Sequence, residues 1–133
     1  QRPDPQIHRR KMSVFEITKA ATFDAAHHFP SEPEGSPYRR IHGHSFQVEA
    51  TVRSEVLDAE HGWVADLGAL DRALKAAAEE LDHGMLNEHA GLELPSLEHL
   101  CLWFAGRLKA DWPGLSRVTV SRPTIHERCV LTL

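Results

Sequence analysis

The sequence predicts an α+β domain built on an antiparallel sheet of four strands, with two helices packed on one face. Three observations lead to this fold class. Two strand-like segments open the chain, two segments with helical periodicity follow them, and two short strand-like segments close it. Strands that follow one another, instead of alternating with helices, favour an antiparallel sheet. The 133 residues are enough for one domain with its own core.

The first two predicted strands lie on either side of a long loop. Residues 14–29 are rich in β-branched and aromatic side chains and contain neither glycine nor proline, which is typical of a strand. Residues 45–56 alternate between apolar and polar side chains, so one face of this strand is expected to be buried. Between them, residues 30–41 carry three prolines and a glycine. We expect an irregular loop there, and a loop of this length is often functional.

The first predicted helix covers residues 66–81, with Asp66 as its N-cap. Its apolar side chains recur at helical spacing and form one stripe. The stripe consists of Leu67, Leu70, Leu74, Ala77, Ala78 and Leu81.

The second predicted helix follows Pro95, with Ser96 as its N-cap, and ends before residues 112–114, Trp-Pro-Gly. Its apolar stripe consists of Leu97, Leu100, Cys101, Phe104 and Leu108. Residues 116–120 and 128–133 then form two short strands. A sheet of only four strands has open edges, and we expect these edges to pair with other copies of the chain.

Composition narrows the class of protein further. We expect residues 1–11 to be a tail or tag-like extension, without the hydrophobic segment of a signal peptide, and residues 12–133 to be a single domain. The net charge of −4 argues against nucleic-acid binding. No apolar run approaches the ~18 residues of a membrane span. Two cysteines without CxxC spacing suit a reducing cytoplasm.

Histidine is the unusual residue, with ten copies. His42 and His44 flank a single glycine, and in an extended segment residues i and i+2 point the same way. His27 ends the preceding strand, and the loop can bring it to the pair. Three neutral imidazoles with an open fourth position form a zinc site of the catalytic type. The alternative is that the pair is only a feature of the loop surface.

A second pair, Asp82 and His83, follows the first predicted helix. A carboxylate beside an imidazole can hold its tautomer and raise its basicity. The alternative is that the two residues merely end the helix, where a histidine is favourable to the negative end of the dipole.

Five motifs follow one another in the order FDAAHHF, IHGHSF, VADLGAL, ELDHGMLNE and PSLE. This order, across residues 14–122, resembles the family of 6-pyruvoyl-tetrahydropterin and 6-carboxy-tetrahydropterin synthases. The resemblance implies a tunnelling fold, trimers that pair into hexamers, and zinc bound by three histidines. Carried over residue by residue, these ligands are His27, His42 and His44. Asp82 and His83 match the proton-relay pair of the family.

The resemblance also implies a small-molecule substrate, 7,8-dihydroneopterin triphosphate, and the product 6-carboxy-tetrahydropterin, an early step toward queuosine. Three alternatives remain open: a 6-pyruvoyl-tetrahydropterin synthase, a variant that forms a hydroxymethyl-pterin, and a pterin-binding relative without catalysis.

The chain departs from the family at the catalytic cysteine, whose position four residues before the HGH motif holds Tyr38. Tyrosine, with an ordinary pKa of ~10, is a poor base near neutral pH. Glu34 in the same loop is a candidate substitute, or else a solvated acid. Cys101 and Cys129 are expected to act as small hydrophobic residues instead.

A second departure lies near the C-terminus. The resemblance places a pterin-binding glutamate where the chain has Arg122, and a guanidinium has no acceptor. Glu127, a few residues on, either substitutes for it or is a surface acid. Arg39 and Arg40 are either ligands of a substrate triphosphate or solvated loop residues.

Overall fold

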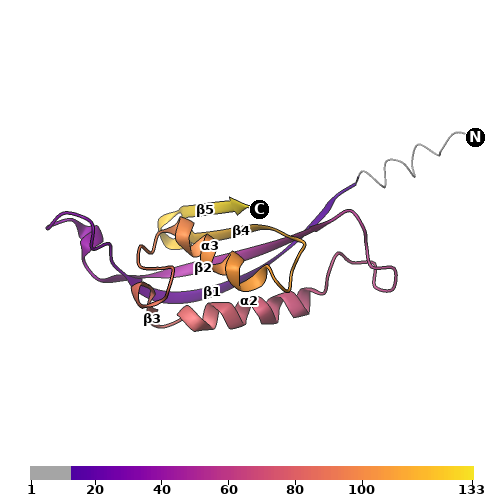
Figure 1. The fold of residues 1–133 in the computed structure, drawn as a ribbon, viewed down its shortest axis with the longest axis horizontal. Coiled ribbons are helices and arrows are strands. Elements are labelled where there is room, and N and C mark those ends of the chain that lie inside the picture. The colour runs from indigo at the N-terminus through magenta and orange to yellow at the C-terminus, as the bar shows by residue number, and fades with distance from the viewer. Residues whose placement is uncertain (1–12) are drawn as a thin grey trace, which may run out of the picture.

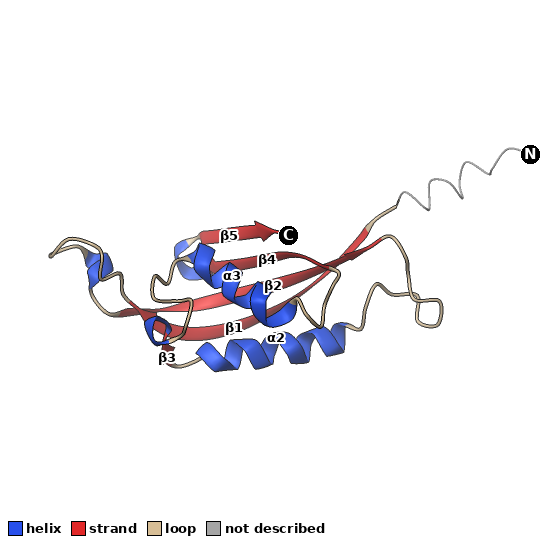
Figure 2. Cartoon of the chain, in the orientation of Figure 1, coloured by secondary structure: helices blue, strands red, loops and turns tan. Residues whose placement is uncertain are grey.

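The computed structural model describes residues 13–133, which form a five-stranded sheet with two helices on one of its faces (Figure 1 and Figure 2). The α+β class and the helices on one face are confirmed. The strand order is β3-β1-β2-β4-β5. The extension predicted for residues 1–11 lies outside the described residues, as does Met12.

Strands β1 (Phe15–His27) and β2 (His42–Ser54) form the long antiparallel hairpin at the centre of the sheet. Their register places His27 directly opposite His42, at the end of the hairpin nearest the loop. Because side chains alternate along a strand, one face of the hairpin is apolar and buried beneath the helices. Its buried residues are Ala21, Phe23, Ala25, Phe46, Val48, Ala50 and Val52.

The prediction of four strands is wrong by one. Strands β4 (Leu115–Arg122) and β5 (Glu127–Thr132) extend the sheet antiparallel beyond β2, as expected. The fifth strand, β3 (Gly84–Met85), pairs parallel with the end of β1. Two residues are too few for a periodic pattern, so no local signal reveals this strand. A tight turn positions it: His83 has a φ of 58° and its N–H donates to the carbonyl of Asp24 over 2.6 Å.

Helices α2 (Leu67–Leu81) and α3 (Leu97–Leu108) begin at the predicted caps. The Asp66 carboxylate accepts a hydrogen bond from the Gly68 N–H over 2.8 Å. The Ser96 hydroxyl accepts one from the His99 N–H over 3.1 Å. Both predicted stripes are buried except at Leu67, which is 44% exposed in the first turn of α2. Neither helix of the described part is long and apolar enough to cross a bilayer.

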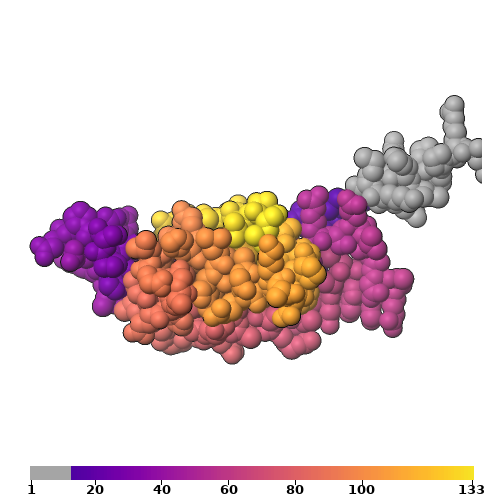
Figure 3. All heavy atoms as spheres, in the orientation of Figure 1, coloured from indigo at the N-terminus to yellow at the C-terminus, as the bar shows by residue number. Residues whose placement is uncertain are grey.

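The loop between β1 and β2 forms a separate lobe at one end of the molecule (Figure 3). The expectation of a wholly irregular loop is wrong at Pro37–Arg39, which form one turn of 3-10 helix. Proline has a helix-compatible φ at its first position, and the Ser36 hydroxyl accepts from the Tyr38 N–H over 3.3 Å.

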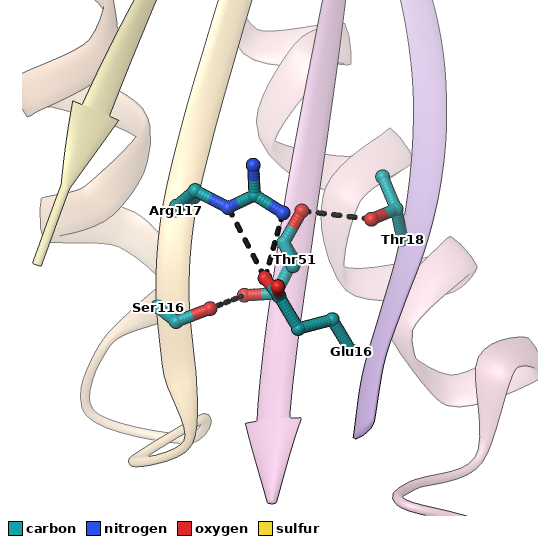
Figure 4. A network of polar contacts seen from close by, with 5 residues as sticks. All are labelled: Glu16, Thr18, Thr51, Ser116 and Arg117. Carbon is teal, nitrogen blue, oxygen red and sulfur yellow. Dashed lines mark hydrogen bonds and ion pairs between the residues drawn. The ribbon is translucent and has the colours of Figure 1, made fainter. Parts of the chain in front are cut away.

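The face of the sheet away from the helices is polar. Arg117 on β4 bonds Glu16 on β1 at 2.6 Å, above the central strand (Figure 4). The hydroxyls of Thr18 and Thr51 lie 2.8 Å apart in the same group. This face therefore contributes no second core, and the sheet is covered on one side only.

Candidate metal centre

Three histidine rings meet at the end of the β1–β2 hairpin. His27 and His42 are a cross-strand pair, and His44 projects from the same face two residues along β2. The ring centroids lie 4.6 Å apart for His27 and His42, and 4.9 Å apart for the other two pairs. The ring planes are inclined to one another by 70° to 89°. The rings thus converge as the sequence predicts.

Backbone carbonyls orient two of the rings. The Nδ1–H of His27 donates to the carbonyl of Pro95 over 3.3 Å, and that of His42 to the carbonyl of Arg40 over 2.7 Å. A carbonyl can only accept, so each Nδ1 carries the proton and each Nε2 retains its lone pair. The Nε2 atoms of His27 and His42 lie 3.1 Å apart.

The residues present fit a metal ion. One nitrogen from each ring lies within 4.8 Å of the others. The Nε2 of His44 is buried and has no hydrogen-bond partner within residues 13–133, which is costly unless an electron-pair acceptor occupies the space. Three imidazoles without a carboxylate are a donor set that suits zinc.

The electrostatics favour the neutral form of the His27 and His44 rings. The pKa of His27 is lowered to about 4, first by its burial and then by the positive charges of His42 and His44 when protonated. The pKa of His44 is lowered by burial, then by the Arg122 guanidinium, and Glu127 opposes this shift. Neutral rings can coordinate a metal without first losing a proton.

Asp82 and His83 form a hydrogen-bonded pair just after α2. The Nδ1–H of His83 lies 2.9 Å from Asp82 Oδ2, and Asp82 Oδ1 accepts from the Asp24 N–H over 2.9 Å. The pKa of His83 is raised by its hydrogen bond to Asp82 and by the negative charge there. The pKa of Asp82 is lowered, first by the Asp24 N–H and then by His83. The pair can therefore hold and release a proton.

A pocket of about 440 Å³ lies beside this pair, with Asp24, Ser45 and His83 in its lining. The Ser45 hydroxyl donates to Asp24 Oδ1 over 2.5 Å. Asp24 and Ser45 are adjacent to Phe23 and Phe46, which point into the core, so their own side chains project from the helix-free face.

The three rings lie on the other face. His44 also borders the pocket, but its ring packs 5.7 Å from that of Phe46 on the helix-covered face. Within one chain, the structure thus brings the three histidines together and brings Asp82 to His83. Among residues 13–133, no hydrogen bond, ion pair or ring contact joins the two groups.

Tyr38 and Glu34 both lie in the protruding loop. Tyr38 is 60% exposed, and its ring lies 6.4 Å from that of Phe29, which in turn lies 5.2 Å from the His27 ring. Glu34 is exposed. Arg39 donates to the carbonyl of Glu32 over 3.1 Å, within the loop itself.

Arg122 and Glu127 lie on the same face of the sheet as the histidine rings. They are a cross-strand pair at the near ends of β4 and β5, and Arg122 Nε lies 3.1 Å from Glu127 Oε1. The side chain of Arg122 is 15% exposed and that of Glu127 is 49% exposed.

Sequence reasoning missed the residues that support the site. The carbonyl of Pro95 holds His27, and no side-chain pattern identifies a carbonyl. Asn87 accepts from the His28 N–H over 3.1 Å and donates to the His28 carbonyl over 2.8 Å. Its place in the ELDHGMLNE motif is the signal that could have found it. Cys101 is buried, as expected, and burial raises the pKa of its thiol to about 12.

The fold and the cluster define a class: a small α+β protein with a centre suited to a metal ion bound by imidazoles. Comparison with known proteins identifies the family within this class. A family model described as 6-pyruvoyl tetrahydropterin synthase matches residues 16–132, and the chain belongs to this family.

Two relatives are proteins with different activities. A 6-carboxy-5,6,7,8-tetrahydropterin synthase of Synechocystis sp. is 39% identical over 109 residues, which are 78% of this chain and 83% of the relative. A dihydroneopterin monophosphate aldolase of Pyrococcus furiosus is 33% identical over 98 residues, 74% of this chain and 78% of the relative. The family is thus one of pterin-processing enzymes.

Solved structures share the fold at low identity. The 6-pyruvoyl tetrahydropterin synthase of Caenorhabditis elegans has a TM-score of 0.76 at 20% identity, covering 91% of this chain and 96% of its own. A Plasmodium vivax 6-pyruvoyltetrahydropterin synthase with a catalytic glutamate replaced has a TM-score of 0.68 at 17% identity, covering 90% and 97%. These likenesses establish the tunnelling fold.

Proposed function

We propose that the chain is a zinc-dependent lyase of the 6-carboxy-tetrahydropterin synthase type, which acts on 7,8-dihydroneopterin triphosphate. The observation that carries the proposal is the convergence of three ring nitrogens at the end of the hairpin. The 39% identity to the Synechocystis enzyme supports the substrate class. The proposed place of this enzyme is the cytoplasm, on a route toward queuosine.

The proposed metal ligands are His27, His42 and His44. A zinc ion held by these three residues would supply Lewis-acid chemistry, which polarises a substrate oxygen and lowers the pKa of a hydroxyl. His83 is the proposed base that takes a proton from a carbon beside that oxygen. Asp82 keeps the proton of the neutral ring on Nδ1, which leaves Nε2 to accept the transferred proton.

The proposed active site is completed between copies of the chain, as a trimer or hexamer. His83 faces the pocket on the helix-free side of the sheet, whereas the metal-centre rings lie on the covered side. A base on one face cannot reach a substrate held on the other. A neighbouring copy supplies the missing half.

Product analysis tests the proposed lyase. Zinc-loaded protein incubated with dihydroneopterin triphosphate should release acetaldehyde, inorganic triphosphate and a carboxylated tetrahydropterin, which mass spectrometry identifies. His44→Ala should form neither, whereas His61→Ala, in an exposed loop, should form both. Absence of any pterin product from fully zinc-loaded protein would contradict the proposal.

A second candidate is an aldolase that forms a hydroxymethyl-pterin. The position of the family's cysteine holds Tyr38, and the two cysteines of the chain lie on α3 and β5, outside this loop. The Pyrococcus relative is an aldolase, and the Plasmodium protein has a catalytic glutamate, which supports Glu34 as the substitute.

The same assay separates the two candidates. Cleavage between the two hydroxyl-bearing carbons of the side chain leaves a hydroxymethyl-pterin and a two-carbon aldehyde that keeps the phosphates. Glu34→Gln should then lower the rate at least tenfold while Glu32→Gln does not. If neither Glu34→Gln nor Tyr38→Phe changes the rate, the loop contributes no base.

A further inference from the structure

Arg122 places a guanidinium on the buried face of the sheet, where the preceding residue on that face, Val120, is fully buried. The pairing of Ser121 with Gln47 sets Arg122 beside Phe46 in the neighbouring strand. Phe46 in turn packs against the metal-centre rings. The face thus runs from the three histidines, past Phe46, to one arginine.

This positive charge lies near the metal centre, because Arg122 and the His44 ring both flank Phe46 on this face. A cation beside a site for a divalent ion is repelled by that ion. An anionic group placed between the two is attracted by both, so the arrangement favours a ligand that carries negative charge.

The guanidinium has donors to spare. Glu127 is the carboxylate that pairs with Arg122 among residues 13–133; its Oε1 lies 3.1 Å from Nε, yet Nε is buried and makes no hydrogen bond of good geometry there. The Glu127 side chain is 49% exposed, so solvent screens its charge and the pair leaves the guanidinium only partly compensated. A guanidinium is a planar fork of donors that suits phosphate and carboxylate oxygens.

We propose that Arg122 binds an oxyanion of the ligand held at the metal centre, and that Glu127 competes for the same guanidinium. The two sources of such an oxyanion are the phosphate chain of the substrate and a carboxylate formed on the pterin. The identity of the ligand rests on the proposed function, whereas the oxyanion site itself is a property of Arg122 and can be tested without turnover.

Calorimetric titration of the zinc-loaded protein with inorganic triphosphate tests the phosphate, and titration with pterin-6-carboxylate tests the carboxylate. Arg122→Gln should weaken binding of at least one of them about tenfold or more, because a charge-assisted contact is lost. Glu127→Gln should strengthen it severalfold by removing the competitor. Arg117→Gln, on the same strand but on the opposite face (Figure 4), should stay within twofold of the wild type.

The direction of the Glu127→Gln effect separates this role from a structural one. If Arg122 only positions Glu127, both variants lose affinity alike, and the proposal is overturned. It is also overturned if the wild type binds neither anion, or if Arg122→Gln binds both as the wild type does. If Arg122→Gln loses binding and the wild type turns over no pterin, the proposed lyase activity is contradicted while the proposed oxyanion site is supported.

Discussion

At the scale of single residues, His27 illustrates how burial suits a side chain to the proposed role of metal ligand. It is fully buried, and its pKa of about 4 keeps the ring neutral far below neutral pH. The carbonyl of Pro95 fixes which nitrogen carries the proton. Burial would disfavour a charged side chain here, and the same burial makes a neutral donor ready to coordinate.

His44→Ala should abolish zinc binding. The variant removes one of three donors, which costs more than the ~10–100-fold typical of changes outside the ligand set. Metal analysis after dialysis against a weak chelator should give about one zinc per wild-type chain and almost none in the variant. His61→Ala is the control, because its ring pairs with Asp58 in an exposed loop. Full zinc occupancy in His44→Ala would remove this residue from the centre.

Asp82→Asn should lower the pKa of His83 toward its ordinary value of ~6.5. The raised pKa comes first from the hydrogen bond to Asp82 and then from its charge. The protonated ring of the wild type thus contributes stability below ~6.5 that is lost as the pH rises through the raised pKa, and the variant loses this contribution. NMR titration of the His83 ring measures the shift.

Two comparisons make that titration decisive. Asp58→Asn removes the equivalent partner of His61 and should leave His83 unchanged. If His83 is the base, the acid limb of the pH–rate profile in Asp82→Asn moves to lower pH with the measured pKa. A His83 pKa that does not fall would mean that Asp82 is not its proton partner.

At the scale of elements, the long hairpin and both helices follow from local patterns. Alternation along β2 and the apolar stripes of α2 and α3 identify the buried faces, and Asp66 and Ser96 identify the helix starts. HxH spacing together with a histidine at the preceding strand end is enough to predict that the rings converge. These features depend on residues close together in the chain.

Features that depend on distant pairings were not predictable. Strand β3 has two residues and no pattern of its own. The pairing of Asp24 with Ser45 appears only once the hairpin register is known. The placement of His83 opposite the metal-centre face depends on a backbone hydrogen bond to Asp24, which no side-chain motif encodes.

Ser96→Ala should weaken both the start of α3 and the metal centre. Loss of the cap costs about 1 kcal/mol, and the loosened turn also carries Pro95, whose carbonyl holds His27. We expect the midpoint of urea unfolding to fall and zinc affinity to weaken severalfold. Asp66→Ala removes the cap of α2 at a similar cost and should leave zinc affinity unchanged. Equal zinc affinities in the two variants would show that the α3 cap does not support the centre.

At the scale of the whole molecule, the sheet separates the two groups of proposed site residues. The histidine cluster and Arg122 occupy the helix-covered face, and Asp24, Ser45 and His83 occupy the other. Edge strands β3 and β5 leave backbone groups available for pairing with other copies. Association of several copies would therefore pair the backbone groups of the edge strands and bring the two groups of proposed site residues together in the same step.

Mixing two inactive variants tests this division. His44→Ala lacks a metal ligand and His83→Ala lacks the base, so each should be inactive alone. In mixed oligomers formed by unfolding and refolding equal amounts together, about a quarter of the shared sites receive one intact half from each of two copies, if subunits combine at random. Activity should recover to about that fraction of the wild type. Mixed oligomers that native mass spectrometry detects but that remain inactive would place both halves of the site within a single chain.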